Sequence, residues 1–210
     1  MASIVIFGGT GYAGSAIAAE AVRRGHSVTS VSPSGRPAPA GVTSVQGSVG
    51  DATLVDKLAA GADVIVIGMR ATSGELASAL PGLLDAAARH GTRIGVVGGA
   101  GSLHVSDGGP RVVDLPGFPE VHKGEALAHA DVLAAIRTAP AEVDWFYLSP
   151  AATFGSHAPG EATGSYRTSG DILLSDAEGN SYISGADYAT AFVDEIEQPA
   201  HRRQRFHVAY

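Results

Sequence analysis

Glycines cluster near the start of the chain in a pattern that could hold phosphates. The stretch "GGTGYAG" places Gly8, Gly11 and Gly14 at three-residue spacing between an apolar run and a helix-like segment. The first glycine permits a tight turn, the second lets the backbone approach a pyrophosphate, and the third allows close helix–strand packing. The following helix N-terminus offers free N–H groups to an anion. The spacing predicts a dinucleotide site; a glycine-rich turn without a ligand is the alternative. The other residues predicted for this loop are Thr10, Tyr12 and Ala13.

Serines and an arginine, rather than an acid, follow the second predicted strand in "VSPSGR" (31–36). A carboxylate there would accept a hydrogen bond from the ribose 2′-hydroxyl of NAD and repel the 2′-phosphate of NADP. Ser32 and Ser34 can donate hydrogen bonds, and Arg36 carries a fixed positive charge. The sequence therefore predicts a preference for NADP(H), with NAD(H) also accepted if Arg36 faces solvent and the site is unselective.

Residues at the ends of other predicted strands extend this site. Asp51 could place its carboxylate near the adenine amino group, cap the helix 52–60, or do both. Arg70 could contact a phosphate or an acidic substrate, or lie on the surface. Ligands of open parallel sheets bind outside the carboxyl ends of the strands, and the remaining cofactor contacts predicted there are Gly68, Met69, Gly98 and Gly99.

Three side chains could act on a substrate. Ser102 follows a predicted strand, and its hydroxyl could donate to a carbonyl or flavin oxygen; a hydrogen bond within its loop is the alternative. His122 and Lys123 open a predicted helix, where both cations face the positive end of the helix dipole. They could bind substrate or donate a proton, and surface solvation is the alternative reading of both. These three residues are the catalytic candidates.

The elements that must position these residues alternate along the chain. Strands are expected at 3–7, 26–32, 63–68, 93–99 and 143–149, with a weaker candidate at 42–47. Helical periodicity is found at 12–24, 52–60, 73–90 and 121–138, and a helix (185–197) and a strand (204–209) close the chain. The alternation predicts an α/β fold, a Rossmann-type doubly wound parallel sheet with helices on both faces.

Domain organisation follows from length and from two long segments without helical pattern. We expect one NAD(P)-binding domain over residues 1–210. The segments 99–120 and 150–171 both follow predicted strands, and long loops of this kind are usually functional or mobile. The part from about 150 to 210 is expected to shape the substrate side, and Trp145 is expected in the core.

Composition excludes several classes of function. The chain has no cysteine, which excludes disulfides and thiolate chemistry, and its 8 histidines show no metal-ligand spacing, so no metal is predicted. A net charge of −7 without a basic stripe argues against nucleic acid. The chain has no run of about 18 apolar residues, so no membrane span is predicted. The start lacks signal-peptide features, and we expect a cytoplasmic protein.

Six stretches carry a family resemblance: "IFGGTGYAGSAI", "VVGGAGSL" (96–103), "VDLPGFP" (113–119), "DWFYLSPAATF" (144–154), "PGEATGSYR" (159–167) and "ISGADYATAFVDEIE" (183–197). On these residues the chain resembles the atypical short-chain dehydrogenase/reductases, the NAD(P)H-binding group that includes NmrA-like proteins. Within that group it is similar to small bacterial proteins labelled NADH-flavin reductases, and more distantly to biliverdin/flavin reductase. The resemblance covers nearly the whole chain.

The resemblance implies a Rossmann fold, a bound dinucleotide and a substrate site over the nicotinamide. It also implies that the loop reaching Tyr166 and Arg167 acts as a lid. One departure concerns the Tyr-x-x-x-Lys pair of ordinary short-chain dehydrogenases, which is absent because no tyrosine lies four residues before either lysine. His122 stands where close relatives often carry tyrosine. The implied nicotinamide contacts are Pro150, Ala151 and Ala152.

Together these features predict an NAD(P)H-dependent oxidoreductase that transfers hydride to a flavin, a quinone or a related small carbonyl compound. A non-catalytic NAD(P)H-binding redox sensor of the NmrA type is the alternative. An enzyme similar to nucleotide-sugar epimerases is disfavoured, because the tyrosine–lysine pair is missing and the C-terminal part is short. The expected partner is a small-molecule substrate, and the expected assembly is a monomer or homodimer.

Overall fold

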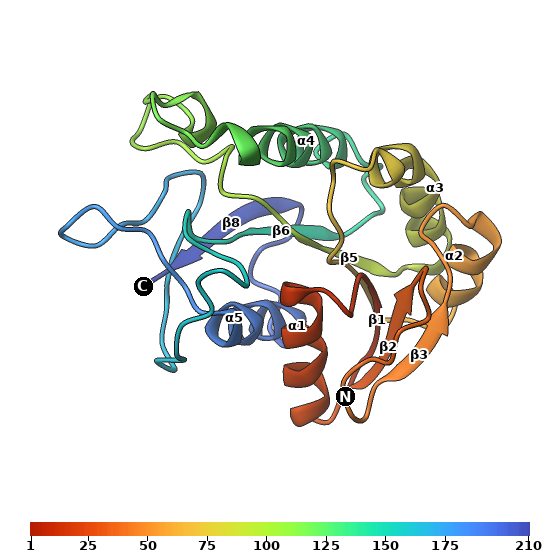
Figure 1. Ribbon diagram of the computed structural model, residues 1–210. Helices are drawn as coiled ribbons and strands as arrows, with labels where there is room; N and C mark the ends of the chain where they lie inside the picture. The colour runs from red at the N-terminus through yellow and green to blue at the C-terminus, as the bar shows by residue number, and fades with distance from the viewer.

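The computed structural model describes residues 1–210 and holds one eight-stranded sheet with helices on both faces (Figure 1). The strands are β1 (Ser3–Phe7), β2 (Ser27–Ser32), β3 (Thr43–Gln46), β4 (Val64–Ile67), β5 (Arg93–Val97), β6 (Trp145–Ser149), β7 (Arg167–Ser169) and β8 (Gln204–Ala209). The helices are α1 (Tyr12–Arg23), α2 (Ala52–Ala59), α3 (Glu75–His90), α4 (Glu120–Ile136) and α5 (Gly185–Glu197), with a 3₁₀ turn at Val112–Asp114. The predicted Rossmann-type α/β fold is confirmed. No helix combines the length and the apolar character needed to cross a membrane.

The order of the strands creates a crevice beside the glycine loop. Across the sheet the order is β3-β2-β1-β4-β5-β6-β8-β7, and every neighbouring pair is parallel except β7 and β8. The chain runs outward from β1 through β2 to β3 and then returns to β4 on the other side of β1. Such a reversal leaves a crevice at the carboxyl ends of the two central strands. The glycine loop follows β1 and therefore lies at this crevice.

Two apolar layers hold the sheet between the helices. One layer lies under α2, α3 and α4, and the other lies under α1 and α5. Side chains of β6 alternate between them: Trp145 and Tyr147 belong to the first layer, and Phe146 and Leu148 to the second. Trp145 is 1% exposed, which confirms its predicted place in the core.

The long segments contain more structure than the sequence pattern indicated. Figure 1 shows both on the same side of the molecule, beyond β6 and β8. The loop expected to act as a lid runs as far as Tyr166, and its role as a lid stays a prediction. Arg167 begins β7, which pairs antiparallel with β8, and Tyr166 donates a hydrogen bond to Asp194 of α5. Strand pairing fixes Arg167 to the edge of the sheet, and the hydrogen bond fixes Tyr166 to α5.

Candidate functional site

The glycine loop forms a cradle that side chains would fill. Gly8 has a φ of +89°, and a Cβ atom built on it would lie 2.6 Å from the carbonyl oxygen of Gly68. A Cβ on Gly14 would lie 2.3 Å from the carbonyl oxygen of Gly8. Contacts this short do not occur between real atoms, so glycine is required at both positions. Gly68, predicted as a cofactor contact, therefore packs directly against the loop.

Gly11 differs from Gly8 and Gly14 because a Cβ on it would meet a tight contact rather than an impossible one. It is exposed, and the nearest atom to a Cβ built on it is 3.3 Å away. Gly11 is also the N-cap residue of α1, and no side chain caps this helix. The first N–H groups of a helix need an acceptor from outside the helix, and the partial positive charge there favours an anion. The cradle therefore fits the pyrophosphate of a dinucleotide.

Tyr12 and its neighbours link this cradle to the segment after β6. The Tyr12 ring packs edge-on against Phe154, with centroids 5.3 Å apart, and its hydroxyl donates to the carbonyl of Pro159 at 3.4 Å. Ala13 packs on the apolar layer under α1, and Thr10 is half-buried in the turn. The phosphate cradle and the segment expected to shape the substrate side are thus in direct contact.

The loop after β2 presents the side chains predicted to select the cofactor. Ser32 is buried, whereas Ser34 and Arg36 are exposed, and Arg36 Nε donates to Ser34 Oγ at 3.2 Å. Gly35, at a φ of +59°, forms the turn between them. The serines and the arginine therefore lie in one turn at the carboxyl end of β2. Their role toward a 2′-phosphate stays a prediction.

Asp51 caps the helix that follows it. Its Oδ1 accepts hydrogen bonds from the N–H groups of Thr53 (3.1 Å) and Leu54 (3.0 Å) at the start of α2. The capping prediction is confirmed. A contact with adenine stays a prediction for the exposed second oxygen of this carboxylate.

A cavity of about 410 Å³ opens at the carboxyl ends of β5 and β6. The five cofactor contacts predicted in this region, Gly98, Gly99, Pro150, Ala151 and Ala152, all line it. Gly98 packs on the ring of Tyr147, where a Cβ would lie 2.0 Å from a ring carbon, and the Tyr147 hydroxyl accepts from Gly99 N–H at 3.0 Å. Tyr147 therefore fixes one edge of the cavity from below.

One face of α4 forms the opposite wall. His122, Glu125, Ala126 and His129 line the cavity, and this spacing of three and four residues places them on one side of the helix. Lys123 is rotated away from that side, and its Nζ lies 3.5 Å from Glu120 on the outer surface. The helical period thus separates the two neighbouring candidates: His122 faces the cavity, and Lys123 does not.

Ser102 also lies outside the cavity lining. Its hydroxyl oxygen accepts from Arg205 Nη1 at 3.2 Å, and its carbonyl accepts from Arg205 Nη2 at 3.4 Å. The alternative given above was a hydrogen bond within the loop of Ser102, whereas the partner in the structure is Arg205 of β8. Arg205 is buried on β8 and draws Ser102 toward the sheet. The expectation of a hydroxyl that faces the substrate is corrected on this point.

Glu125 and His129 are cavity residues that the sequence reading missed. Glu125 accepts from Ala71 N–H (2.8 Å) and Thr72 Oγ1 (2.6 Å), and its Oε1 lies 3.2 Å from Nε2 of His129. Burial raises the pKa of Glu125, but the hydrogen bonds from His129, Thr72 and Ala71 outweigh it and hold the pKa below its ordinary value. The spacing 122–125–126–129 in "HKGEALAH" was the available signal.

Glu125 joins the wall of the cavity to the segment after β4. That segment begins with Gly68, which touches the glycine loop, and continues through Met69, which packs partly buried on the layer under α2–α4. Arg70 is mostly exposed, with Nε 3.5 Å from Glu125. The acidic partner of Arg70 thus belongs to the protein, and a phosphate contact from Arg70 stays a prediction.

These features define a doubly wound α/β protein with a dinucleotide cradle at its switch point and a second cavity on the same edge of the sheet. The model of a family described as NAD(P)H-binding matches residues 8–199. The chain belongs to this NAD(P)H-binding family, which agrees with the resemblance to atypical short-chain dehydrogenase/reductases.

Three solved structures are similar over the whole chain. A protein of Burkholderia pseudomallei described as a "putative exported protein" is 41% identical, with TM-score 0.89 and 100% of both chains covered. A "putative NADH-flavin reductase" of Streptococcus pneumoniae is 33% identical, with TM-score 0.88 and 100% and 99% covered. A "putative epimerase" of Bacteroides thetaiotaomicron is 32% identical, with TM-score 0.87 and 99% and 96% covered. These descriptions differ, so the choice of reaction depends on the site.

Proposed function

We propose that this protein is an NAD(P)H-dependent reductase that transfers hydride to a flavin, a quinone or a related small carbonyl compound. The observation that carries the proposal is the placement of the cavity beside the cradle. Both lie at the carboxyl edge of one sheet, and Tyr12 connects them through its contact with Phe154. A site of this form can hold a dinucleotide and a second small molecule side by side, as hydride transfer requires.

Each part of the site would hold one part of the dinucleotide. The cradle of Gly8, Gly11 and Gly14 fits the pyrophosphate, and the turn at Ser34 and Arg36 is suited to the 2′-phosphate of NADP(H), the proposed preferred cofactor. When bound, the nicotinamide supplies the hydride. The residues proposed to contact the nicotinamide are Gly98, Gly99, Pro150, Ala151 and Ala152.

The remaining cavity residues would position the hydride acceptor and hold a proton at the cavity wall. Glu125 is an ionised carboxylate with its donors in place, so it favours a proton on Nε2 of His129. His122 presents an imidazole at the cavity wall, where it can bind the acceptor. A flavin needs little acid catalysis, so the missing tyrosine–lysine pair does not oppose this reaction. We propose a cytoplasmic location for the same chemistry, because NADPH is an intracellular reductant.

Stopped-flow measurement of NADPH oxidation against flavins, quinones and aldehydes tests the proposal. We expect His122→Ala to lower the hydride-transfer rate more than the cofactor affinity. Lys123→Ala is the matched control, because Lys123 neighbours His122 but lies on the outer face of α4. Cofactor binding without reduction of any acceptor above the blank, together with a protein partner that binds one redox form only, would establish the redox-sensor alternative instead.

A further inference from the structure

Two imidazole rings face each other at the cavity, from parts of the chain far apart in sequence. His122 lies in the first turn of α4, and His157 lies in the segment after β6. Both line the cavity, and both are exposed. Their ring centroids are 6.4 Å apart, and their planes differ by 21°. The two rings are therefore nearly parallel, and they reach the same cavity from two different elements.

The backbone around His157 is shaped to hold its ring. Ala158 N–H donates to the carbonyl of Gly155 at 3.0 Å, which closes a tight turn with His157 inside it. Gly155 has a φ of +148°, and a Cβ on it would lie 2.9 Å from Cε1 and Nδ1 of His157. Glycine is favoured here because side chains rarely adopt this φ, and a Cβ would displace the His157 ring. The position of His157 is thus a product of local backbone geometry.

The two rings would have to move apart to admit a third ring between them. Carbon atoms in contact lie about 3.5 Å apart, so a planar ring with one imidazole on each face needs about 7 Å. The centroids are 6.4 Å apart, which is about 0.6 Å short of that spacing. A small outward shift of the exposed turn at 155–158 would admit a flat molecule.

The chemistry of the cavity wall agrees with a flat, conjugated guest. Phe118, on the side of α4, and Phe154, on the side of His157, add aromatic surface to the two walls. The lining contains no lysine or arginine, and its one carboxylate, Glu125, is already bonded to Ala71, Thr72 and His129. Offset aromatic stacking therefore dominates what this part of the cavity can offer a ligand.

We propose that His122 and His157 form an imidazole clamp that binds the planar conjugated ring of the hydride acceptor between them. The inference rests on the proposed function and narrows it: the acceptor is a fused heteroaromatic or quinone ring, and aliphatic aldehydes are poor substrates. The clamp selects the acceptor by its shape, whereas the cradle of the glycine loop binds the cofactor.

Riboflavin fluorescence tests the clamp without turnover. The protein is saturated with NADP⁺ and titrated against riboflavin, whose emission falls when its ring stacks. Loss of a stacking ring costs about 1–3 kcal/mol, so we expect His157→Ala to weaken riboflavin binding about 5- to 100-fold. His157→Phe should keep most of the affinity, and the NADP⁺ affinity should be unchanged in both. His90→Ala is the control, because His90 lies on α3, bonded to Asp56 and away from the cavity.

Gly155→Ala supplies a second variant, because it keeps both imidazoles and displaces one of them. It should weaken riboflavin binding while circular dichroism stays native. The clamp is overturned if His157→Ala leaves riboflavin affinity intact, if it weakens NADP⁺ binding equally, or if His157→Phe fails to restore binding. Reduction of aliphatic aldehydes without riboflavin binding would retain the reductase and reject the clamp. Clamp-dependent riboflavin binding without any turnover would retain the clamp and reject the reductase.

Discussion

A Cβ atom on Gly14 would overlap the carbonyl oxygen of Gly8, at a distance of 2.3 Å. The third glycine of the loop is therefore needed by the fold itself, because the first turn of α1 rests on the end of the loop. A Cβ on Gly11 would lie 3.3 Å from the same oxygen, a contact that a shift of a few tenths of an ångström relieves. Gly14 therefore tests what this motif needs for folding, and Gly11 tests what it needs for binding its ligand.

Substitution of Gly11 and Gly14 should therefore have different effects. Gly11 is exposed and has a φ of −81°, which any residue adopts, and the tightest contact of an added Cβ is 3.3 Å. Gly11→Val should leave the circular dichroism spectrum and thermal midpoint near wild type and abolish the enhancement of NAD(P)H fluorescence. Gly14→Val should overpack the loop and cost about 1–3 kcal/mol or more of stability. Unchanged cofactor affinity in Gly11→Val would reject the dinucleotide site.

Glu125→Gln should loosen the wall of the cavity. An amide NH₂ would replace one oxygen that accepts from Ala71, Thr72 or His129, and one buried donor would lose its acceptor. We expect a loss of about 1–3 kcal/mol at pH 7, measured by urea unfolding. Glu142→Gln is the control, because Glu142 is exposed. An equally small effect of both substitutions at pH 7 would contradict the role of Glu125 as a link.

The same residue makes a prediction about pH. Since the folded-state pKa of Glu125 is below its ordinary value, its contribution to stability is present above about pH 4.5 and is lost as the pH falls toward the folded-state value. The stability difference between wild type and Glu125→Gln should therefore shrink in acid. A difference that grows as the pH falls from 7 to 3 would show that the carboxylate is not the stabilising form.

The elements were predictable because their signals are local. Helix α5 and strand β8 begin and end where the periodicity predicts, since apolar spacing and the Ser184 cap are written in consecutive residues. Strand β7 was not predicted because three exposed or half-buried residues carry no alternation, and its pairing with β8 defines it. A local sequence pattern thus identifies helices and strands that have a buried face. It misses a strand that is defined only by its pairing with another strand.

The candidate site was predictable only where backbone geometry determines it. The glycine loop could be identified from spacing alone. Ser102 could not be placed, because its partner Arg205 is 103 residues away in the chain. The link of Glu125 to Ala71 spans 54 residues and depends on how α4 docks beside the segment after β4. Side-chain roles that depend on such docking have no local signature.

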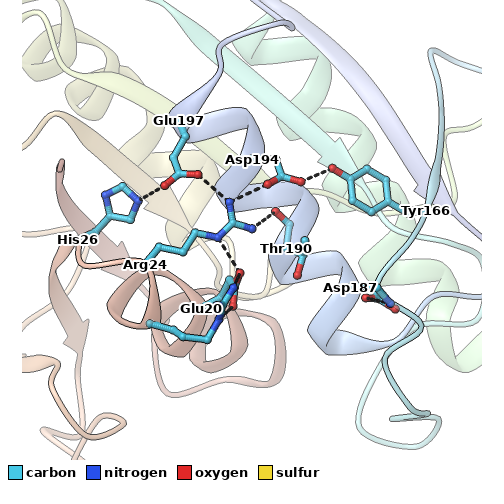
Figure 2. Close-up of polar contacts among 10 residues, drawn as sticks. Glu20, Arg24, His26, Tyr166, Asp187, Thr190, Asp194 and Glu197 are labelled. Carbon is cyan, nitrogen blue, oxygen red and sulfur yellow. Dashed lines mark hydrogen bonds and ion pairs between the residues drawn. The ribbon is translucent and has the colours of Figure 1, made fainter.

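Arg24 ties α1 to α5 in a polar network, and its removal should lower stability in a pH-dependent way. Arg24 donates to Glu20, Asp194 and Glu197, each at 2.7 Å (Figure 2). Arg24→Met should lower the free energy of unfolding by about 1–2 kcal/mol at pH 7, since three carboxylates lose their shared cation. For a protein of this size that is a fall in Tm of about 2–8 °C.

The carboxylates of this network set the pH range of the effect. Hydrogen bonds from Arg23 and then Arg24 hold the pKa of Glu20 at about 2, against partial burial. The stability contribution of Glu20 is therefore complete above about pH 4.5 and falls away between there and about pH 2. The Tm difference between wild type and Arg24→Met should shrink over that range. Arg23→Met is the control, because Arg23 is exposed and bonded to Glu20 alone. An equal loss of Tm in Arg23→Met would contradict the role of Arg24 in joining the two helices.

Arg36 should distinguish NADPH from NADH. Its guanidinium is exposed in the turn after β2, hydrogen-bonded to Ser34 Oγ at 3.2 Å, and no acid occupies this turn to repel a 2′-phosphate. A hydrogen bond to a charged group is worth about 1.5–3 kcal/mol, and each 1.4 kcal/mol is a tenfold change in affinity. Arg36→Ala should thus weaken NADPH binding about 10- to 100-fold and leave NADH binding nearly unchanged. Ser32→Asp should shift the preference toward NADH. Because Ser32 is buried, circular dichroism must show that this variant keeps the native fold. Fluorescence titration of both cofactors into wild type and Arg36→Ala decides the question, because equal wild-type affinities, or equal losses for both cofactors, would mean that this turn does not recognise the 2′-phosphate.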